Sequence, residues 1–164
     1  MRDASWPTSV TRDTGRIQPA REPDMDDVDA LVKFLDAGRL MEVKQLLESG
    51  VDPNGRNSVG ERPIMIAACN NDLDALDLLL QFGAEVNRAY EQGWTALHEA
   101  VDCSIDSTIQ GGGSPGDEPL ESILWLVAHG ADLNAKTERG ETPLDIARSY
   151  RSIRVEQALG SAAQ

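Results

Sequence analysis

The side chains with the richest chemistry in this 164-residue chain lie in one short stretch, GWTALHEAV, which runs from Gly93 to Val101. It contains Thr95 and His98, and histidine is found at only one other position. A hydroxyl and an imidazole at this spacing could act as a nucleophile and its base, and the imidazole could also bind a metal. Both uses need further partners, and the only other histidine, His129, lies 31 residues away with no Cys, His or carboxylate set at ligand spacing. We therefore predict no enzymatic activity, no bound metal and no cofactor.

Cys69 and Cys103 are the only cysteines. Two cysteines could form one disulfide, but no other feature of the sequence indicates secretion. We therefore predict two free thiols in a reducing, cytoplasmic location.

Composition limits the class of protein. A hydrophobic content of 40% is typical of a soluble globular protein, and 4% aromatics predicts a core of aliphatic residues and alanine. The net charge of −13, from 15 basic and 28 acidic residues, argues against nucleic acid as a partner because phosphates would be repelled. No stretch approaches 18 consecutive apolar residues, so we predict no membrane span. Residues 1–24 have scattered charges and prolines, and we expect a disordered leader before one folded domain over residues 25–160.

Two sets of recurring phrases organise this domain. The phrases ESGVDPN, QFGAEVN and AHGADLN follow one another at intervals of 33 and then 47 residues. The phrases GERPIMIAA, GWTALHEAV and GETPLDIAR show the same two intervals. Because 47 is 33 plus 14, two independent markers indicate one repeating unit with a single 14-residue insertion.

Each unit predicts a pair of short helices. A Thr-Pro pair or its equivalent starts the first helix, since proline fits the first turn. A second helix follows, as in LDALDLLLQF, where leucines recur at helical spacing and a glycine then ends the helix. A helix pair this short cannot bury its apolar face alone, so we predict that the pairs stack into an all-α repeat solenoid.

These units resemble the ankyrin repeat, which carries T-P-L-H-x-A and a later G-A-D-V-N. The resemblance implies about four helix-turn-helix repeats, at about residues 27–56, 57–89, 90–136 and 137–159, joined by β-hairpin fingers. It also implies that Thr95, His98, Thr142 and Pro143 are structural, because Thr and His of this motif hydrogen-bond within and between repeats. Repeat two has Arg62 and Met65 at the Thr and His positions, so we expect it to be held less firmly.

The resemblance places Trp94 at a variable position of a finger, with Tyr90 beside it. Exposed Trp and Tyr are enriched at binding hot spots, which predicts a contact with a partner. The alternative is that Trp94 folds down onto Arg139 or apolar atoms of the next finger. Trp125 lies at helical spacing inside ILWLVAHG and is predicted to be core.

Acidic residues are concentrated in the middle repeats. Residues 63–135 contain 12 Asp and Glu but a single basic residue, Arg88. We expect Asp72, Asp74 and Asp77 to lie on a solvated outer helix face. The resemblance places the first helices and the fingers on a concave binding surface, which would then be acidic and would attract a basic partner.

The insertion, about Asp106 to Pro119, reads DSTIQGGGSPGDEP. The preceding SIDSTI could extend the first helix of repeat three by about one turn before the glycines break it. The glycine run is not a phosphate-binding loop, because no Gly-Lys-Ser/Thr follows and the neighbours are acidic. We expect a mobile loop beside the concave surface that contacts a partner.

The function predicted from these features is a non-catalytic protein-binding module that acts as a monomer. Small acidic chains of this family are similar to immunity proteins, which implies an inhibitor that neutralises a basic toxin or effector; a scaffold without inhibitory action is the alternative. The residues predicted to bind the partner are Tyr90, Glu91, Trp94, Asp102, Cys103, Asp106, Asp117, Glu118, Cys69, Asn70 and Glu61.

Overall fold

The structure is a computed structural model that describes residues 25–114 and 116–162, so the predicted leader at residues 1–24 lies outside the described residues. Within these ranges the chain forms helices and no strand, and no helix there is long and apolar enough to cross a membrane. The elements are α1 (Met25–Asp36), α2 (Leu40–Glu48), α3 (Pro63–Cys69), α4 (Leu73–Gln81), the 3-10 turn η1 (Glu91–Gly93), α5 (Ala96–Gln110), α6 (Glu121–Ala128), α7 (Pro143–Ser149) and α8 (Ile153–Ala162).

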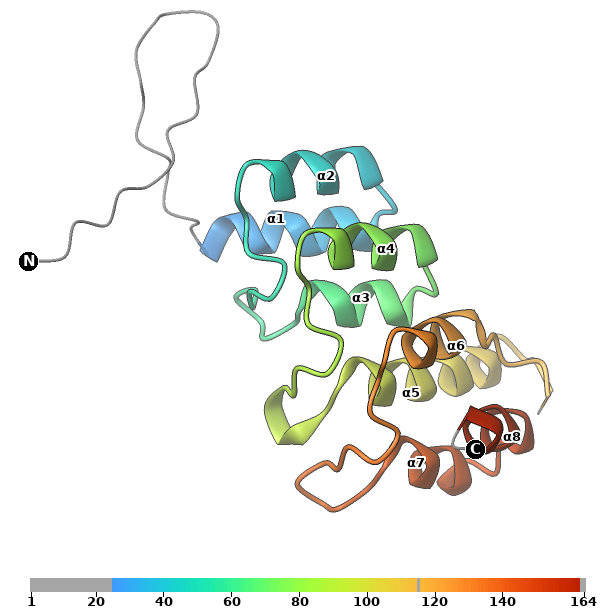
Figure 1. Cartoon of the computed structure of the whole chain (residues 1–164). Coiled ribbons are helices and arrows are strands. Elements are labelled where there is room, and N and C mark those ends of the chain that lie inside the picture. Colours follow the sequence, from blue (N-terminus) through green and yellow to red (C-terminus); the bar gives the residue numbers. More distant parts are fainter. Residues whose placement is uncertain (1–24, 115, 163–164) are drawn as a thin grey trace, which may run out of the picture.

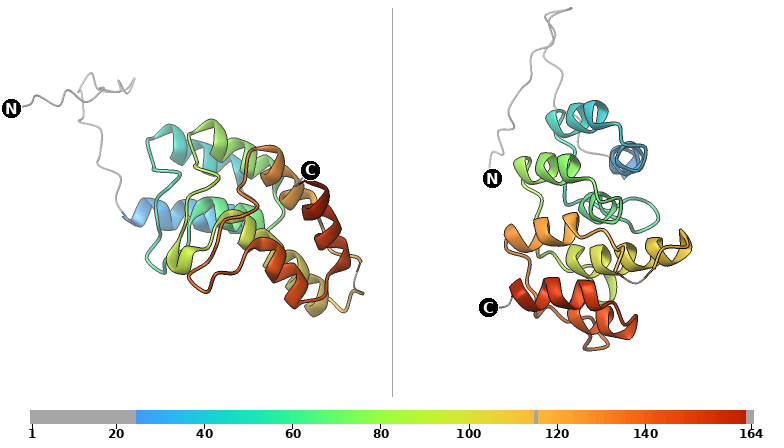
Figure 2. Two further views of the ribbon diagram at one scale, coloured as in Figure 1. Left: turned by 60° about the horizontal axis from the view of Figure 1, so that its bottom comes forward. Right: turned by 90° about the vertical axis from the view of Figure 1, so that its right-hand side faces the viewer.

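The helices form two layers, which confirms the predicted all-α repeat solenoid (Figures 1 and 2). The odd-numbered helices form one layer, in which α3 packs against α1 and α5, and α5 packs against α7. The even-numbered helices form the other layer, and each packs against the odd-numbered helix of its own pair. We call the layer of odd-numbered helices the inner layer.

The core runs between the two layers and is almost entirely aliphatic. Leu76, Leu79 and Leu126 are 0% exposed, and small residues such as Ala147 are also fully buried. Trp125, predicted to be core, is only partly buried. Its indole Nε1 donates a hydrogen bond of 2.7 Å to the Asp77 carboxylate, and its ring stacks on His129 with 3.8 Å between centroids. The tryptophan therefore joins α6 to α4 at the edge of the core.

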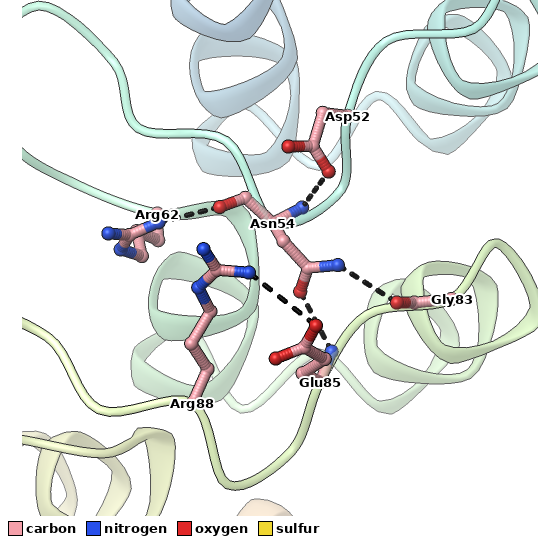
Figure 3. Close-up of polar contacts among 6 residues, drawn as sticks. All are labelled: Asp52, Asn54, Arg62, Gly83, Glu85 and Arg88. Atoms are coloured by element: carbon pink, nitrogen blue, oxygen red, sulfur yellow. Dashed lines mark hydrogen bonds and ion pairs between the residues drawn. The ribbon is translucent and has the colours of Figure 1, made fainter.

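An asparagine in the recurring phrase holds adjacent repeats together. The Asn54 side-chain amide donates to the backbone oxygen of Gly83 at 2.9 Å, and its Oδ1 accepts from the backbone nitrogen of Glu85 at 2.8 Å (Figure 3). Gly83 and Glu85 lie just after α4, in the next repeat. One side chain thereby provides partners for a backbone donor and a backbone acceptor of the loop that follows α4.

Asn87 makes the same pair of bonds one repeat later. Its amide donates to the Gly130 backbone oxygen at 2.7 Å, and its Oδ1 accepts from the Asp132 backbone nitrogen at 2.8 Å. The 14-residue insertion separates these partners in sequence without disturbing the contact. The repeat geometry is therefore kept across the insertion.

The connections between repeats are loops and not the β-hairpins that were expected. The described residues contain no strand, and one backbone hydrogen bond spans the base of each loop, with a turn bond inside it. The bonds at the base run from Asn57 to Glu61 (2.9 Å), from Tyr90 to Trp94 (2.7 Å) and from Thr137 to Glu141 (3.0 Å). We call these three loops the fingers.

Helix α5 extends further than predicted. It has 15 residues where α3 has 7, a difference of 8 residues, or about two turns against the single turn expected. Its far end projects beyond the other inner helices (Figure 2). The hydroxyl of Ser104 donates to the Pro119 backbone oxygen at 2.6 Å, which holds the returning chain against α5.

Replacing Asn87 by alanine should lower the free energy of unfolding by about 1–2 kcal/mol, because the Gly130 oxygen and the Asp132 N–H lose their partner. Urea denaturation would measure the change. Asn134→Ala is the matched control, because the Asn134 side chain has no hydrogen bond within the described part of the chain; we expect a change within about 0.5 kcal/mol. Equal effects of the two substitutions would contradict the bridging role.

Candidate partner-binding site

Four carboxylates gather on the inner layer near its centre. Asp102 and Asp106 lie on α5 with Glu99, at positions one and two turns along the helix, and Glu61 lies just before α3. We call these four residues the inner-face carboxylates. Burial raises the pKa of Glu99, and the negative charges of Asp102 and Glu61 raise it further.

Asp102 is also tied to the next repeat. The Tyr150 hydroxyl donates a hydrogen bond of 2.9 Å to the Asp102 carboxylate, and this bond raises the pKa of Tyr150. Tyr150 directly follows α7, so the contact joins the middle of α5 to the end of α7. The hydrogen bond from Tyr150 fixes the position of the Asp102 carboxylate. Asp106, one turn further along α5, is partly exposed.

A shallow pocket of about 270 Å³ lies between α1 and α3, beside Glu61. Asp29 and Asp36 contribute two more carboxylates to its wall, and Val32 and Ile66 provide apolar surface. The prediction of site residues missed both aspartates. They are seven residues apart, which places them on one face of α1, and that spacing was visible in the sequence.

Cys69 and Cys103 form a disulfide, so the prediction of two free thiols is wrong. Their separation of 34 residues is one repeat plus one position, which brings the end of α3 against α5 with 5.2 Å between the Cα atoms. The prediction of a cytoplasmic location was based on free thiols, and the disulfide removes that argument. Asn70, also predicted to bind the partner, follows Cys69 at the end of α3 and is exposed.

The disulfide also lies close to a carboxylate. Glu99 lies one turn before Cys103 on α5, and the two cysteines and Glu99 place one ligand atom each within 4.8 Å of one another. Sequence spacing missed this group because one ligand comes from the preceding repeat.

The finger of repeat three is less exposed than predicted. Tyr90 and Trp94 are both partly buried and pack against the core. The Arg62 guanidinium lies over the Tyr90 ring at 5.0 Å from its centroid, and burial raises the pKa of Tyr90. Glu91 remains exposed and forms an ion pair of 2.6 Å with Arg56 of the preceding finger. The surface that this finger presents is therefore mostly polar.

Arg62, which stands where the ankyrin motif has threonine, makes contacts of its own. Its Nη1 donates to the Asn54 backbone oxygen at 2.6 Å (Figure 3), in addition to its stacking on Tyr90. Repeat two is thus joined to repeat three by a guanidinium. Met65, at the histidine position, is partly buried.

His98 is a structural residue in this arrangement. It is 0% exposed, and its Nδ1 lies 3.2 Å from the Thr95 backbone nitrogen and 2.9 Å from the Thr95 hydroxyl. Because Nδ1 accepts from the Thr95 N–H, Nε2 carries the proton and donates to the Glu141 backbone oxygen at 3.2 Å. Burial lowers the pKa of His98, which favours this neutral form. The imidazole thus ties repeat three to the finger of repeat four.

Thr142 and Pro143 begin α7 in the way the motif implies. The Thr142 hydroxyl accepts from the Asp145 backbone nitrogen at 3.2 Å, and the Asp145 carboxylate accepts from the Thr142 backbone nitrogen at 3.0 Å. Pro143 is the first residue of the helix. These contacts form a capping box, which satisfies donors at the start of α7.

Glu118 is 2% exposed, so the prediction that it contacts a partner at the groove edge is wrong. Its Oε1 accepts from the Ser152 hydroxyl and its Oε2 from the Gly116 backbone nitrogen, both at 2.8 Å. Burial alone would raise the pKa of this carboxyl, but these hydrogen bonds outweigh it and lower the pKa. Asp117, by contrast, is exposed and accepts from the Ser114 backbone nitrogen at 3.0 Å. Glu118 fastens the insertion to the start of α8.

Helix pairs stacked in two layers define the class of α-helical repeat solenoids. The chain is a member of the ankyrin repeat family. The family model for three copies of the ankyrin repeat matches residues 32–110, and the model for a single repeat matches residues 92–138.

Three curated proteins are similar to the chain over most of its length. The RelA-associated inhibitor of Mus musculus is 30% identical over 144 residues, covering 87% of this chain and 16% of that protein. The B-cell lymphoma 3 protein homolog of Mus musculus is 34% identical over 119 residues, covering 72% of this chain and 23% of that protein. The cyclin-dependent kinase inhibitor 2A of Homo sapiens is 31% identical over 149 residues, covering 90% of this chain and 86% of that protein. The chain thus spans less than a quarter of the first two relatives and most of the third.

Glu118→Ala should lower the free energy of unfolding at neutral pH by about 1–3 kcal/mol, because it leaves the Ser152 hydroxyl and the Gly116 N–H without an acceptor. The folded pKa of Glu118 lies below its ordinary value of 4.5. The carboxylate therefore stabilises the fold above about pH 4.5, and this contribution is lost as the pH falls through the folded pKa. The difference in the free energy of unfolding between wild type and the Glu118→Ala variant should therefore become smaller as the pH is lowered.

Urea denaturation at about pH 7 and about pH 3 would measure both effects. The control is Glu138→Ala, since Glu138 is exposed and its side chain has no hydrogen bond among the described residues. A Glu118 variant that is no less stable than the Glu138 variant would show that the insertion is not fastened through this carboxylate.

Proposed function

We propose that the protein is a non-catalytic inhibitor that binds a basic protein partner through the inner-face carboxylates. The observation that carries this proposal is the position of Glu99, which lies partly buried on α5 with Asp102 one turn further along the helix and with Glu61 close by. Burial raises the pKa of Glu99, and the charges of Asp102 and Glu61 raise it further. Like charges held together oppose folding and are relieved when a cation binds. A cluster of this kind therefore favours a partner that presents Lys or Arg.

The pocket beside Glu61 suits a long basic side chain. Val32 and Ile66 offer apolar surface for the methylene stem, and Asp29, Asp36 and Glu61 offer carboxylates for the charged group. Lys33 also lines the pocket and is the one opposing charge there among its lining residues. Arginine would fit such a site well because its planar guanidinium pairs with carboxylates in a fixed geometry.

The inhibitory part of the proposal draws on the relatives. Two of the three carry the word inhibitor in their names, and the human one is similar to this chain over 86% of its own length. Within that class, an acidic inner face is suited to a toxin or effector whose basic groove normally binds nucleic acid. The carboxylates would then take the place of phosphates. The inhibitor would act as a single chain in a 1:1 complex.

The first experiment is affinity capture from a lysate of the source organism at low salt, with elution by a salt gradient and identification by mass spectrometry. One basic protein that elutes late, and regains activity when released, would support the inhibitor. Several weakly held proteins that keep their activity would indicate a scaffold instead.

Neutralising the inner face should weaken binding of the captured partner. The variant Glu61→Gln, Asp102→Asn, Asp106→Asn removes three charges and should slow association by about tenfold or more while reducing its dependence on salt. Surface plasmon resonance at two salt concentrations would measure the association rate and its dependence on salt.

The charge-matched control is the triple variant Glu48→Gln, Asp74→Asn, Asp132→Asn. All three carboxylates are exposed; the first two lie on α2 and α4, and the third lies in the loop after α6. It has the same net charge as the inner-face variant. If both triple variants lose the same affinity, net charge alone accounts for binding and the inner face is not the site.

A further inference from the structure

We propose that Cys69, Cys103 and Glu99 bind a zinc ion once the Cys69–Cys103 disulfide is reduced. The site shares Glu99 with the inner-face carboxylates, but zinc binding by these three side chains does not depend on the proposed basic partner. Within the described residues, these three side chains form the one group of three or more His, Cys, Asp or Glu ligands close enough to share an ion.

The three side chains already lie close together in the oxidised chain, in which the two sulfur atoms are bonded to each other. One atom from each side chain lies within 4.8 Å of the others, and the Cys103 Sγ is 3.7 Å from the Glu99 Oε1. In a tetrahedral zinc site with Zn–S bonds of about 2.3 Å, two sulfurs lie about 3.7 Å apart. The 5.2 Å between the two Cα atoms permits that spacing after small side-chain rotations.

The two helices make this arrangement stiff. Glu99 and Cys103 lie one turn apart on α5, so they project from the same face, and Cys69 is the last residue of α3. The inner-layer packing of α3 on α5 fixes the third ligand relative to the other two. A ligand set on rigid elements loses little conformational entropy when the ion binds.

The ligand chemistry selects zinc over the alkaline-earth ions. Two thiolates and one carboxylate suit a borderline-soft cation, whereas magnesium and calcium prefer oxygen ligands alone. The charge of the three ligands is −3, and the charges of Asp102 and Glu61 act on Glu99 as well. Cys69 is exposed, so the fourth position faces solvent and a water molecule can complete the tetrahedron.

Oxidation and metal binding exclude each other in this site. A dithiol reductant transfers two electrons and two protons to the disulfide, which yields two thiols and leaves the reductant as its own disulfide. One zinc ion then replaces the two thiol protons, which are released to solvent. In the reverse direction a small-molecule disulfide takes two electrons from the two thiolates and two protons from solvent, and leaves as two thiols. The protein disulfide forms again, both sulfur ligands are lost and the ion is released. The redox state of the surroundings therefore decides whether the inner layer carries a disulfide or a metal.

The test is zinc titration of the full chain against a chromophoric zinc indicator, before and after treatment with a non-thiol phosphine reductant that is then removed under anaerobic conditions. The reduced protein should bind one equivalent of zinc, and the oxidised protein should bind none at the same concentration. Cobalt as a substitute should give sulfur-to-cobalt charge-transfer absorption in the reduced protein only. A reduced wild-type chain that binds no zinc would overturn the proposal.

Three variants identify the ligands. Cys69→Ser and Cys103→Ser should each abolish stoichiometric binding and the charge-transfer band. Glu99→Gln keeps both thiols and should weaken binding by about tenfold or more, whereas Glu48→Gln, an exposed carboxylate on α2, should leave it unchanged. Circular dichroism verifies that each variant is folded. Undiminished zinc binding in either cysteine variant, or in Glu99→Gln, would rule out the three-ligand site.

Discussion

Every helix pair of this chain depends on its neighbour for a buried apolar face. The helices have between 7 and 15 residues, and pairs of that size cannot close a core alone. Stacking supplies the missing surface, and the Asn54 and Asn87 side chains satisfy backbone groups that stacking would otherwise leave without partners. The position of any surface residue is therefore set by the repeat it belongs to.

The insertion shows how strong this constraint is. Fourteen extra residues leave the Asn87 contact intact, because α5 lengthens and the chain returns to the same point beside it. Ser104 and Glu118 hold the returning segment against α5 and α8. The extra sequence thus enlarges the inner layer at one place without altering the stack, and it adds contacts between repeats three and four.

The same inner layer carries carboxylates whose burial and mutual repulsion do not favour folding. Glu99 is half-buried among like charges, and its raised pKa indicates that the ionised form is disfavoured there. The Cys69–Cys103 disulfide lies directly beside Glu99 and has the opposite effect, because a covalent link between α3 and α5 stabilises the fold. The inner layer thus combines a charge that opposes folding with a bond that offsets it.

The sequence by itself determined the helices and their pairing, because repeats are read from local periodicity and the same phrases recur at fixed intervals. Only the tertiary structure decided which surface residues meet. Glu118 is buried, and Cys69 reaches Cys103, because segments about one repeat apart are folded against each other. Trp94 is partly buried for the same reason. A side chain's exposure depends on neighbours distant in sequence, and no local pattern encodes them.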